Sequence, residues 1–162
     1  MHFRHSLWAL LTTLTLIVPM SAQAADCSSD DHILQATTTK VTCFTLEDLK
    51  LLGATEIETS TLWTDGVHQF TGVLLSDLLQ QIDAQGNTIQ ATAINDYSIT
   101  IPVTDAVEGG PIVAYYLDGA PMSRRDKGPL WVVYPFDSDA KFRTETIYSR
   151  SIWQLNKLEI IE

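Results

Sequence analysis

Aromatic side chains are the residues of this sequence whose types and spacing could bind a flat ring. Tryptophan and tyrosine stand at four positions that could share such a site: Trp63, Trp131, Tyr134 and Trp153. Stacking on an aromatic face contributes roughly 1 kcal/mol beyond the burial of apolar area, and it requires no charge on the ligand. Trp63 precedes the polar stretch Thr64–Gly66, which predicts a loop, where binding residues commonly lie. Trp131 lies in an apolar run, so its position is also compatible with a place in the core.

The segment Asn95-Asp96-Tyr97 supplies polar groups that could contact the edge of a heterocycle. A carboxylate such as Asp96 can accept hydrogen bonds from two N–H groups, and an asparagine side chain both donates and accepts. Asparagine and aspartate are also ordinary turn residues, so the sequence leaves open whether this segment binds a ligand or only reverses the chain. His68 could likewise hydrogen-bond a ligand or simply be exposed. Histidine is the usual catalytic base, but no serine or cysteine partner is recognisable by motif, so no nucleophilic triad is predicted.

Positive charge is scarce in this chain, which makes the position of each cation informative. Ten Lys and Arg residues face twenty Asp and Glu residues, and the formal net charge is -10. Because phosphate groups repel such a protein, the composition argues against nucleic acid and anionic membranes as partners. Arg124, Arg125 and Lys127 form one cluster of cations, and Lys141, Arg143 and Arg150, the last followed by Ser151, come after it; such local positive charge in an acidic protein could mark an anion site. A guanidinium group can hold a phosphate or carboxylate through two parallel hydrogen bonds.

The first 24 residues have the pattern of a secretory signal peptide. A basic start precedes the apolar run Leu7–Val18 and the small-x-small cleavage site Ala22–Ala24. The apolar run is about a dozen residues long, whereas a transmembrane helix needs about 20. The sequence therefore predicts a cleaved signal at 1–24, a periplasmic location and one domain over 25–162. A retained anchor is the alternative.

The two cysteines of the chain are Cys27 and Cys43. An oxidising export compartment makes a disulfide between them the leading interpretation. Because the enclosed loop is short, the bond would stabilise the fold by about 3 kcal/mol on the chain-entropy model. Unpaired thiols and a metal site are the alternatives, although the mature chain has too few histidines for a Cys/His zinc set.

Hydrophobic periodicity predicts short helices set among short strands. One helix is expected after Thr45, which forms a capping pair with Asp48, and Gly53 ends it. A second helix is expected over Leu74–Ile82. Strands are expected at 33–41, 54–62, 89–94, 97–101, 112–117, 130–134 and 153–161. The pattern predicts a single α+β domain with mostly antiparallel strands.

Several segments together carry a resemblance to a known family. They are Phe70–Leu79, Asn95–Ser98 with Ile101-Pro102, Tyr116–Pro121 and Gly128–Pro135. In this order and spacing they resemble the molybdopterin-binding domain of the sulfite oxidase family, over roughly residues 44–162 of the chain. The resemblance implies a sulfite oxidase-like fold with a single pterin cleft on one side. It also adds weight to a site role for the turn before Tyr97, which reads Asp-Gly-Tyr in related domains.

One cysteine that ligates molybdenum in that family has no counterpart at the matching place. The family's ligand comes from a loop shortly before the segment that matches Phe70–Leu79, and the corresponding loop here, Ser60–Gln69, contains no cysteine. Thiolate is the soft ligand that suits such a metal. The expectation is therefore a pterin-binding protein without molybdenum and without redox catalysis. A molybdenum cofactor-dependent oxidoreductase, or a vestigial subunit of one, is the alternative, and a purely structural periplasmic domain is a third.

The C-terminal part of the resemblance suggests both a ligand contact and a partner. Tyr148–Ile152 resembles the family's G-x-K-S-I segment, in which a cation and backbone amides hold the terminal phosphate of the pterin, and Arg150 matches the lysine. Small exported relatives resemble this chain in Trp131–Phe136 and Arg150–Gln154. That subgroup is associated with membrane-bound cyclic-di-GMP enzymes, so the resemblance implies a signalling adaptor for the periplasmic domain of a diguanylate cyclase or phosphodiesterase.

Overall fold

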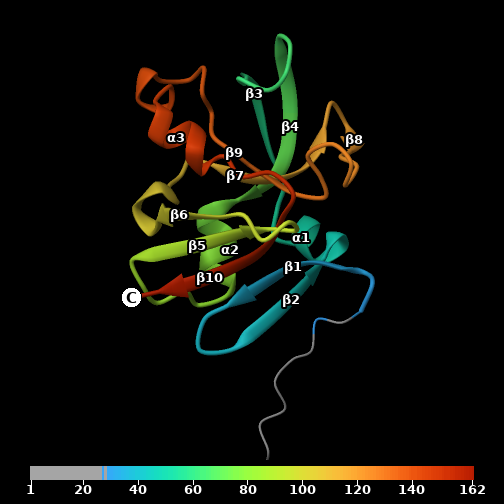
Figure 1. Ribbon diagram of the computed structural model, residues 1–162, viewed down its shortest axis with the longest axis vertical. Coiled ribbons are helices and arrows are strands. Elements are labelled where there is room, and N and C mark those ends of the chain that lie inside the picture. The colour runs from blue at the N-terminus through green and yellow to red at the C-terminus, as the bar shows by residue number, and fades with distance from the viewer. Residues whose placement is uncertain (1–26, 28) are drawn as a thin grey trace, which may run out of the picture.

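Two five-stranded β-sheets form the frame of the protein in this computed structural model (Figure 1). The structure describes residue 27 and residues 29–162. The predicted signal peptide at residues 1–24 lies outside the described residues. In the part of the chain that the structure describes, none of the helices is both long and apolar enough to span a membrane.

The first sheet has the strand order β2-β1-β10-β5-β6. Its members are β1 (His32–Thr37), β2 (Val41–Thr45), β5 (Thr88–Ala93), β6 (Ser98–Pro102) and β10 (Leu155–Ile161). Strands β1 and β10 run parallel, whereas every other pair in this sheet is antiparallel. Along β5, Ile89, Ala91 and Ala93 are buried and alternate with less buried neighbours, as the two-residue period of a strand requires.

The second sheet is antiparallel throughout and is built around β7. Its members are β3 (Thr55–Ser60), β4 (Val67–Leu74), β7 (Ile112–Leu117), β8 (Ala120–Pro121) and β9 (Trp131–Val133). Strand β9 pairs with the first half of β7, and β8 pairs with its end. The first half of β7 and all of β9 are fully buried, which accounts for their unbroken apolar sequence.

The helices are short and lie at the ends of strands. They are the α-helices α1 (Leu46–Leu51), α2 (Leu75–Gln81) and α3 (Glu145–Arg150), with the 3₁₀ helices η1 (Val103–Asp105) and η2 (Ala140–Phe142). The predicted capping pair is confirmed, because the Asp48 N–H donates to Thr45 Oγ1 at 3.2 Å and the Thr45 N–H donates to Asp48 Oδ2 at 2.8 Å. These reciprocal bonds satisfy two amides that the start of a helix leaves free.

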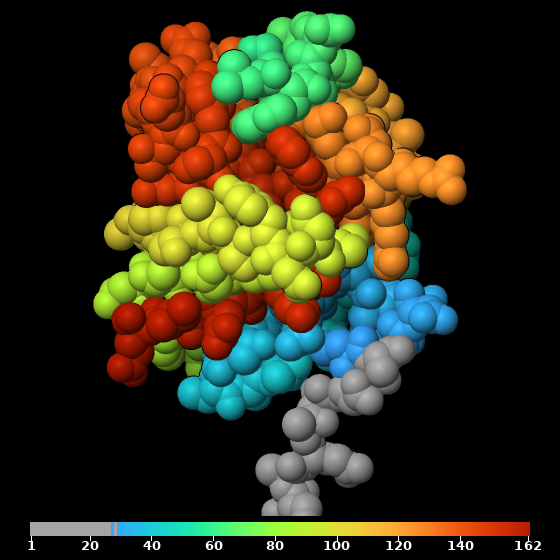
Figure 2. All heavy atoms as spheres, in the orientation of Figure 1, coloured from blue at the N-terminus to red at the C-terminus, as the bar shows by residue number. Residues whose placement is uncertain are grey.

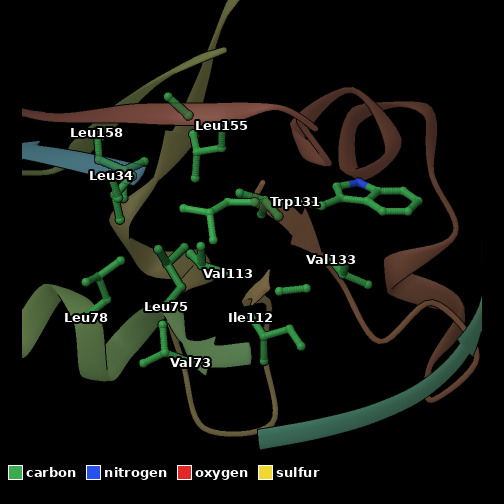
Figure 3. Packing of buried hydrophobic residues seen from close by; sticks show 14 of the residues in the cluster. Leu34, Val73, Leu75, Leu78, Ile112, Val113, Trp131, Val133, Leu155 and Leu158 are labelled. Atoms are coloured by element: carbon green, nitrogen blue, oxygen red, sulfur yellow. The ribbon is translucent and has the colours of Figure 1, made fainter. Parts of the chain in front are cut away.

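The hydrophobic core lies between the two sheets and the buried face of α2. Figure 3 shows Leu34 and Leu158 of the first sheet across from Leu75 and Leu78 of the helix, with Val113 of β7 beside them. All five side chains are at most 1% exposed. The core fixes the sheets in place and thereby positions the loops at one end of the molecule. The predicted α+β class with mostly antiparallel strands is confirmed.

Two sequence-based boundaries are wrong, and one helix is missing from the prediction. The expected strand 33–41 is a hairpin of β1 and β2, since the polar residues 38–40 reverse the chain and let two short strands satisfy each other's backbone groups. The expected ligand loop 60–69 is shorter, because β4 begins at Val67 and pairs with Ser60 of β3. Helix α3, which Thr144 caps through the Ile147 N–H, was not predicted.

Candidate ligand-binding site

A pocket with a volume of about 340 Å³ lies where three parts of the chain meet. These parts are the loop between β3 and β4, the turn between β5 and β6, and the segment from α3 to β10. They supply the following lining residues: Trp63, Ala93, Asn95, Tyr97, Tyr148, Ser149, Ser151, Ile152 and Trp153. Figure 2 shows the green tip at residues 61–67, the yellow turn at 94–98 and the red-orange segment around 145–153 on the same face. The pocket is mainly apolar with a few polar groups, as expected for a small-molecule site.

Trp63 is at the centre of an aromatic cluster that forms one wall of the pocket. Its ring meets Trp153 edge to face at a centroid distance of 5.3 Å, Trp131 at 5.9 Å and Tyr148 at 6.1 Å. Edge-to-face packing is a favourable geometry for aromatic pairs. Of the two tryptophans that line the pocket, Trp63 is half-buried and Trp153 remains 37% exposed. The indole of Trp153 therefore offers the larger free surface on which a planar ligand could stack.

Hydrogen bonds to the segment that follows β9 hold the loop that carries Trp63. The Asp137 carboxylate accepts from the Ser60 N–H at 2.6 Å and from the Ser60 hydroxyl at 2.9 Å. The Asp137 N–H in turn donates to Thr59 Oγ1 at 3.1 Å, and the Trp63 N–H donates to Thr61 Oγ1 at 3.0 Å. The bonds from Ser60 lower the pKa of Asp137. The start of the loop is thus bound to the segment that follows β9.

The polar rim of the pocket comes from the turn between β5 and β6. Asn95 and Tyr97 line the pocket, and Asn95 Oδ1 accepts a hydrogen bond from the Tyr97 N–H at 3.2 Å. Asp96 does not line it. With a φ of 64°, Asp96 occupies the left-handed region, which favours glycine and tolerates aspartate. The backbone of the turn therefore accounts for Asp96 at the position where related domains carry glycine.

Trp131 and Tyr134 lie beneath the pocket rather than on its surface. Both side chains are fully buried. Trp131 Nε1 donates to the Ser151 carbonyl at 3.1 Å, and the Ser151 hydroxyl donates to the Val132 carbonyl at 2.5 Å. The expectation that Trp131 and Tyr134 present a ring to the ligand is therefore wrong in its geometry, because the apolar run that contains them is a buried strand and its continuation. Trp131 instead supports Trp63 and Trp153 from below.

Arg150 forms an ion pair with Asp105. Its Nη1 donates to Asp105 Oδ2 at 2.8 Å, and the Tyr134 hydroxyl donates to the same oxygen at 2.8 Å. The side chains of Arg150 and Asp105 are 20% and 17% exposed. Burial, together with the bond to Asp105, raises the pKa of Tyr134. Arg150 does not line the pocket, whereas its neighbours Ser149 and Ser151 do.

His68 lies on β4 and fastens the other end of the Trp63 loop. Its Nδ1 is 2.7 Å from Asp118 Oδ2, and its Nε2 is 2.9 Å from the Asp65 carbonyl oxygen. The hydrogen bond to Asp118 raises the pKa of His68 and lowers the pKa of Asp118. His68 thus shapes the loop from outside the pocket and does not line it.

Four lining residues were not singled out from the sequence. Ala93, Tyr148, Ser149 and Ile152 border the pocket. All but Ala93 belong to Tyr148–Ile152, the segment that carries the motif resemblance. The signal that could have found Tyr148 is the capping residue Thr144, since a helix starting there places Tyr148 one turn later.

The disulfide and the residues that line the pocket decide whether a cysteine thiolate could bind a metal there. Cys27 and Cys43 are joined, with their Cα atoms 5.5 Å apart, so the predicted disulfide is present. Neither cysteine is among the residues that line the pocket. Within residues 27 and 29–162, His, Cys, Asp and Glu side chains form no cluster of three that could bind a metal ion. The pocket therefore offers a place for a ring and supplies no thiolate.

Comparison with known proteins supports the fold and identifies the family. The sulfane dehydrogenase SoxCD from Paracoccus pantotrophus has a similar structure, with a TM-score of 0.62 and 18% sequence identity. The match covers 85% of this chain and 40% of the SoxCD chain, so this protein spans less than half the length of that relative. The comparison with curated proteins gives no match. The family model of the oxidoreductase molybdopterin binding domain matches residues 32–138, and because that range is more than half of the chain, this protein belongs to that family.

Proposed function

We propose that this protein binds a pterin in the aromatic pocket and acts as a non-catalytic, ligand-sensing protein in the periplasm. The observation that carries the proposal is a pocket walled by Trp63, Trp153 and Tyr148 within a domain of the molybdopterin-binding family. A pterin is a flat heteroaromatic ring with donors and acceptors along one edge. It can stack on the exposed part of Trp153 while Asn95 contacts its polar edge.

The donor set around the pocket does not fit molybdenum. The loop between β3 and β4 has no cysteine, and the two cysteines of the chain are joined to each other. A cysteine in a disulfide cannot act as a thiolate ligand, because metal binding needs the free, deprotonated sulfur. We therefore assign the pocket to the pterin ring alone, without molybdenum.

A phosphorylated pterin fits the pocket less well than a bare one. The lining residues that the structure describes include no Lys, Arg or His. Arg150, which stands between the lining residues Ser149 and Ser151, already has its charge matched by Asp105 at 2.8 Å. Burying a phosphate without a free cation beside it is costly. The ligand class that agrees with the pocket is a neutral pterin without a phosphate group.

The proposed biological role is that of an adaptor. On the resemblance to small exported relatives, the protein would report the pterin to the periplasmic domain of a membrane diguanylate cyclase or phosphodiesterase. Export through a signal peptide at residues 1–24 is part of this proposal. The disulfide supports it, because such bonds persist in oxidising compartments.

A molybdenum cofactor-dependent oxidoreductase, or a vestigial subunit of one, is the second candidate, and membership of the oxidoreductase molybdopterin binding domain family favours it. Elemental analysis of the exported protein separates the two. We expect far less than one molybdenum per chain, and a stoichiometric amount would favour the enzyme.

Calorimetric titration with a bare pterin such as neopterin tests the binding proposal. Saturable binding is expected for the wild type, and Trp153→Ala should weaken it by about five- to a hundredfold, since stacking contributes roughly 1 to 3 kcal/mol per ring. Lys40→Ala is the matched control, because Lys40 is exposed in the β1–β2 turn. A wild type that does not bind neopterin, or binding that is indifferent to Trp153, would reject the pocket as the pterin site.

A further inference from the structure

Gln154 does not line the aromatic pocket, but it stands in the chain between a residue that does and a residue of the core. Trp153 lines the pocket and is 37% exposed, whereas Leu155, the first residue of β10, is fully buried (Figure 3). In a regular strand, residues two positions apart point to the same face of the sheet. The conformation of Gln154 therefore decides whether its two neighbours can have such different surroundings.

The backbone of Gln154 departs from the extended conformation of a strand. Its φ is 53°, in the left-handed region, which is costly for a residue that has a Cβ atom. This residue interrupts the regular alternation, so that Trp153 faces the pocket and Leu155 faces the core. A left-handed residue other than glycine persists only where surrounding contacts hold it, and such residues are common at binding sites.

Hydrogen bonds from three groups of Gln154 hold it in this conformation. Its N–H donates to the Lys127 carbonyl at 2.9 Å, and its carbonyl accepts from the Ile94 N–H at 2.9 Å. The side-chain Nε2 donates to the Arg124 carbonyl at 2.7 Å and to the Asp126 carbonyl at 3.4 Å. Gln154 thus connects the loop that follows β8 to the turn between β5 and β6.

The contact with Ile94 links Gln154 to the polar rim of the pocket. Ile94 directly precedes Asn95, and both Asn95 and Tyr97 line the pocket. Trp153, on another wall, is the neighbour of Gln154 in the chain. Gln154 therefore holds two walls of the pocket in a fixed relation, and the loop after β8, which lines no part of this pocket, holds Gln154.

We propose that Gln154 is a positioning residue of the pterin site. Its side-chain amide holds the left-handed backbone that places the Trp153 indole opposite the turn carrying Asn95. This inference rests on the proposed pterin function and adds to it a residue that acts on the ligand through Trp153 and Ile94. If the glutamine served only to hold the loop after β8, ligand affinity would not depend on its amide.

The isosteric variant Gln154→Glu tests the role of the amide. It keeps the shape of the side chain but replaces two N–H donors by a carboxylate that faces the Arg124 and Asp126 carbonyl oxygens. The loss of one net hydrogen bond predicts neopterin binding roughly three- to tenfold weaker than in the wild type at about pH 7.5. Toward about pH 4.5 the carboxyl group gains a proton and can donate again, so the affinity ratio to the wild type at the same pH should approach one.

Gln154→Gly separates the backbone from the side chain. Glycine adopts the left-handed conformation without steric cost, so this variant keeps the backbone and loses the amide. It should bind neopterin roughly three- to tenfold more weakly as well, and without recovery at low pH. Gln80→Glu, which adds the same charge at an exposed position of α2, is the matched control and should bind like the wild type. Wild-type affinity in both Gln154 variants, or a Gln154→Glu loss that persists at low pH, would overturn the proposal.

The indole N–H resonances of the protein without ligand report the position of Trp153 independently of pterin binding. The Trp153 signal, assigned with Trp153→Phe, should shift in Gln154→Glu at neutral pH and return toward its wild-type position at low pH. The Trp131 signal, whose N–H donates to the Ser151 carbonyl, should move less. A Trp153 signal that neither Gln154 variant changes would overturn the positioning role. A wild type that does not bind neopterin would instead reject the pterin proposal, and this measurement would still decide the position of Trp153.

Discussion

At the residue scale, His68 has a feature that its sequence position did not reveal. Both of its ring nitrogens face an oxygen acceptor, namely Asp118 Oδ2 at 2.7 Å and the Asp65 carbonyl at 2.9 Å. A neutral imidazole has a single N–H, so making both bonds requires the doubly protonated ring. The raised pKa of His68 agrees with this geometry. In its protonated form His68 can make both bonds and tie the Trp63 loop to the turn after β7.

The charge of His68 predicts a pH dependence. A pKa raised above the ordinary value of 6.5 means that the folded state holds the proton more tightly. The stabilising contribution is complete below that ordinary value and is lost as the pH rises through the raised pKa. An NMR titration of the imidazole should give a His68 pKa above 6.5, and Asp118→Asn should lower it because the partner charge is removed. A His68 pKa that Asp118→Asn leaves unchanged would contradict the ion pair.

The Arg150–Asp105 pair yields a prediction about ligand selectivity. If the pair is what withholds Arg150 from an anionic ligand, Asp105→Asn should release the guanidinium while its amide oxygen still accepts from Tyr134. The variant should shift the ratio of affinities toward a phosphorylated pterin by several-fold relative to neopterin. Competition titration with the two pterins measures this ratio. An unchanged ratio would show that Arg150 lies too far from the ligand to act on it.

At the element scale, the second sheet depends on a close approach between β4 and β7. A Cβ atom on Gly72 would lie 2.3 Å from the Val113 carbonyl oxygen, at the place where the β4–β7 register shifts. The next nearest atom, the Ala114 Cα at 2.6 Å, also belongs to the backbone, so the strands would have to move apart. Gly72 is therefore required by the packing of the strands, and it lies on the strand that leads from the Trp63 loop into the core.

Gly72→Ala should accordingly lower the free energy of unfolding by about 2 to 3 kcal/mol. Guanidinium denaturation followed by tryptophan fluorescence gives the value. Thr71→Ala, at the neighbouring position on β4, removes atoms instead of adding one and is the matched control. A Gly72→Ala variant as stable as the control would mean that β4 and β7 can separate without loss.

The loop anchor supplies a second prediction at this scale. Asp137→Ala removes the hydrogen bonds from Ser60, so the loop should become more mobile and pterin affinity should fall several-fold. The pKa of Asp137 is lowered, which places its stabilising contribution above the ordinary value of 3.8 and removes it as the pH falls through the lowered one. Asp139→Ala, two residues away, is the control. Unaltered neopterin affinity in Asp137→Ala would show that the loop holds its shape without this anchor.

At the scale of the whole molecule, the disulfide joins the segment before β1 to β2 at the edge of the first sheet. The two cysteines are 16 residues apart, which corresponds to about 3 kcal/mol on the chain-entropy model. The double variant Cys27→Ser/Cys43→Ser should lose about this amount in chemical denaturation. Reducing agent should lower the stability of the wild type and leave the double variant unchanged. Equal stability of the oxidised protein and the variant would contradict this expectation.

The sequence by itself determined the features that depend on neighbouring residues. The capping pair of Thr45 and Asp48 acts over three residues, and the apolar spacing of Leu75, Leu78 and Leu79 marks α2 in the same way. The family resemblance rests on short segments in a fixed order, and the family model matches much of the same range. The absence of a cysteine from the loop before β4 is also a property of the sequence alone.

Only the tertiary structure decided which of the candidate residues meet. Trp131 and Trp153 are the same residue type, yet one is fully buried and the other remains 37% exposed. Arg150 is matched by Asp105, 45 residues earlier in the chain, and no local pattern predicts that ion pair. The pocket joins three segments that the two sheets bring together. Sequence spacing governs contacts within a helix or strand, whereas the exposure of a ring and the partner of a charge depend on packing between distant segments.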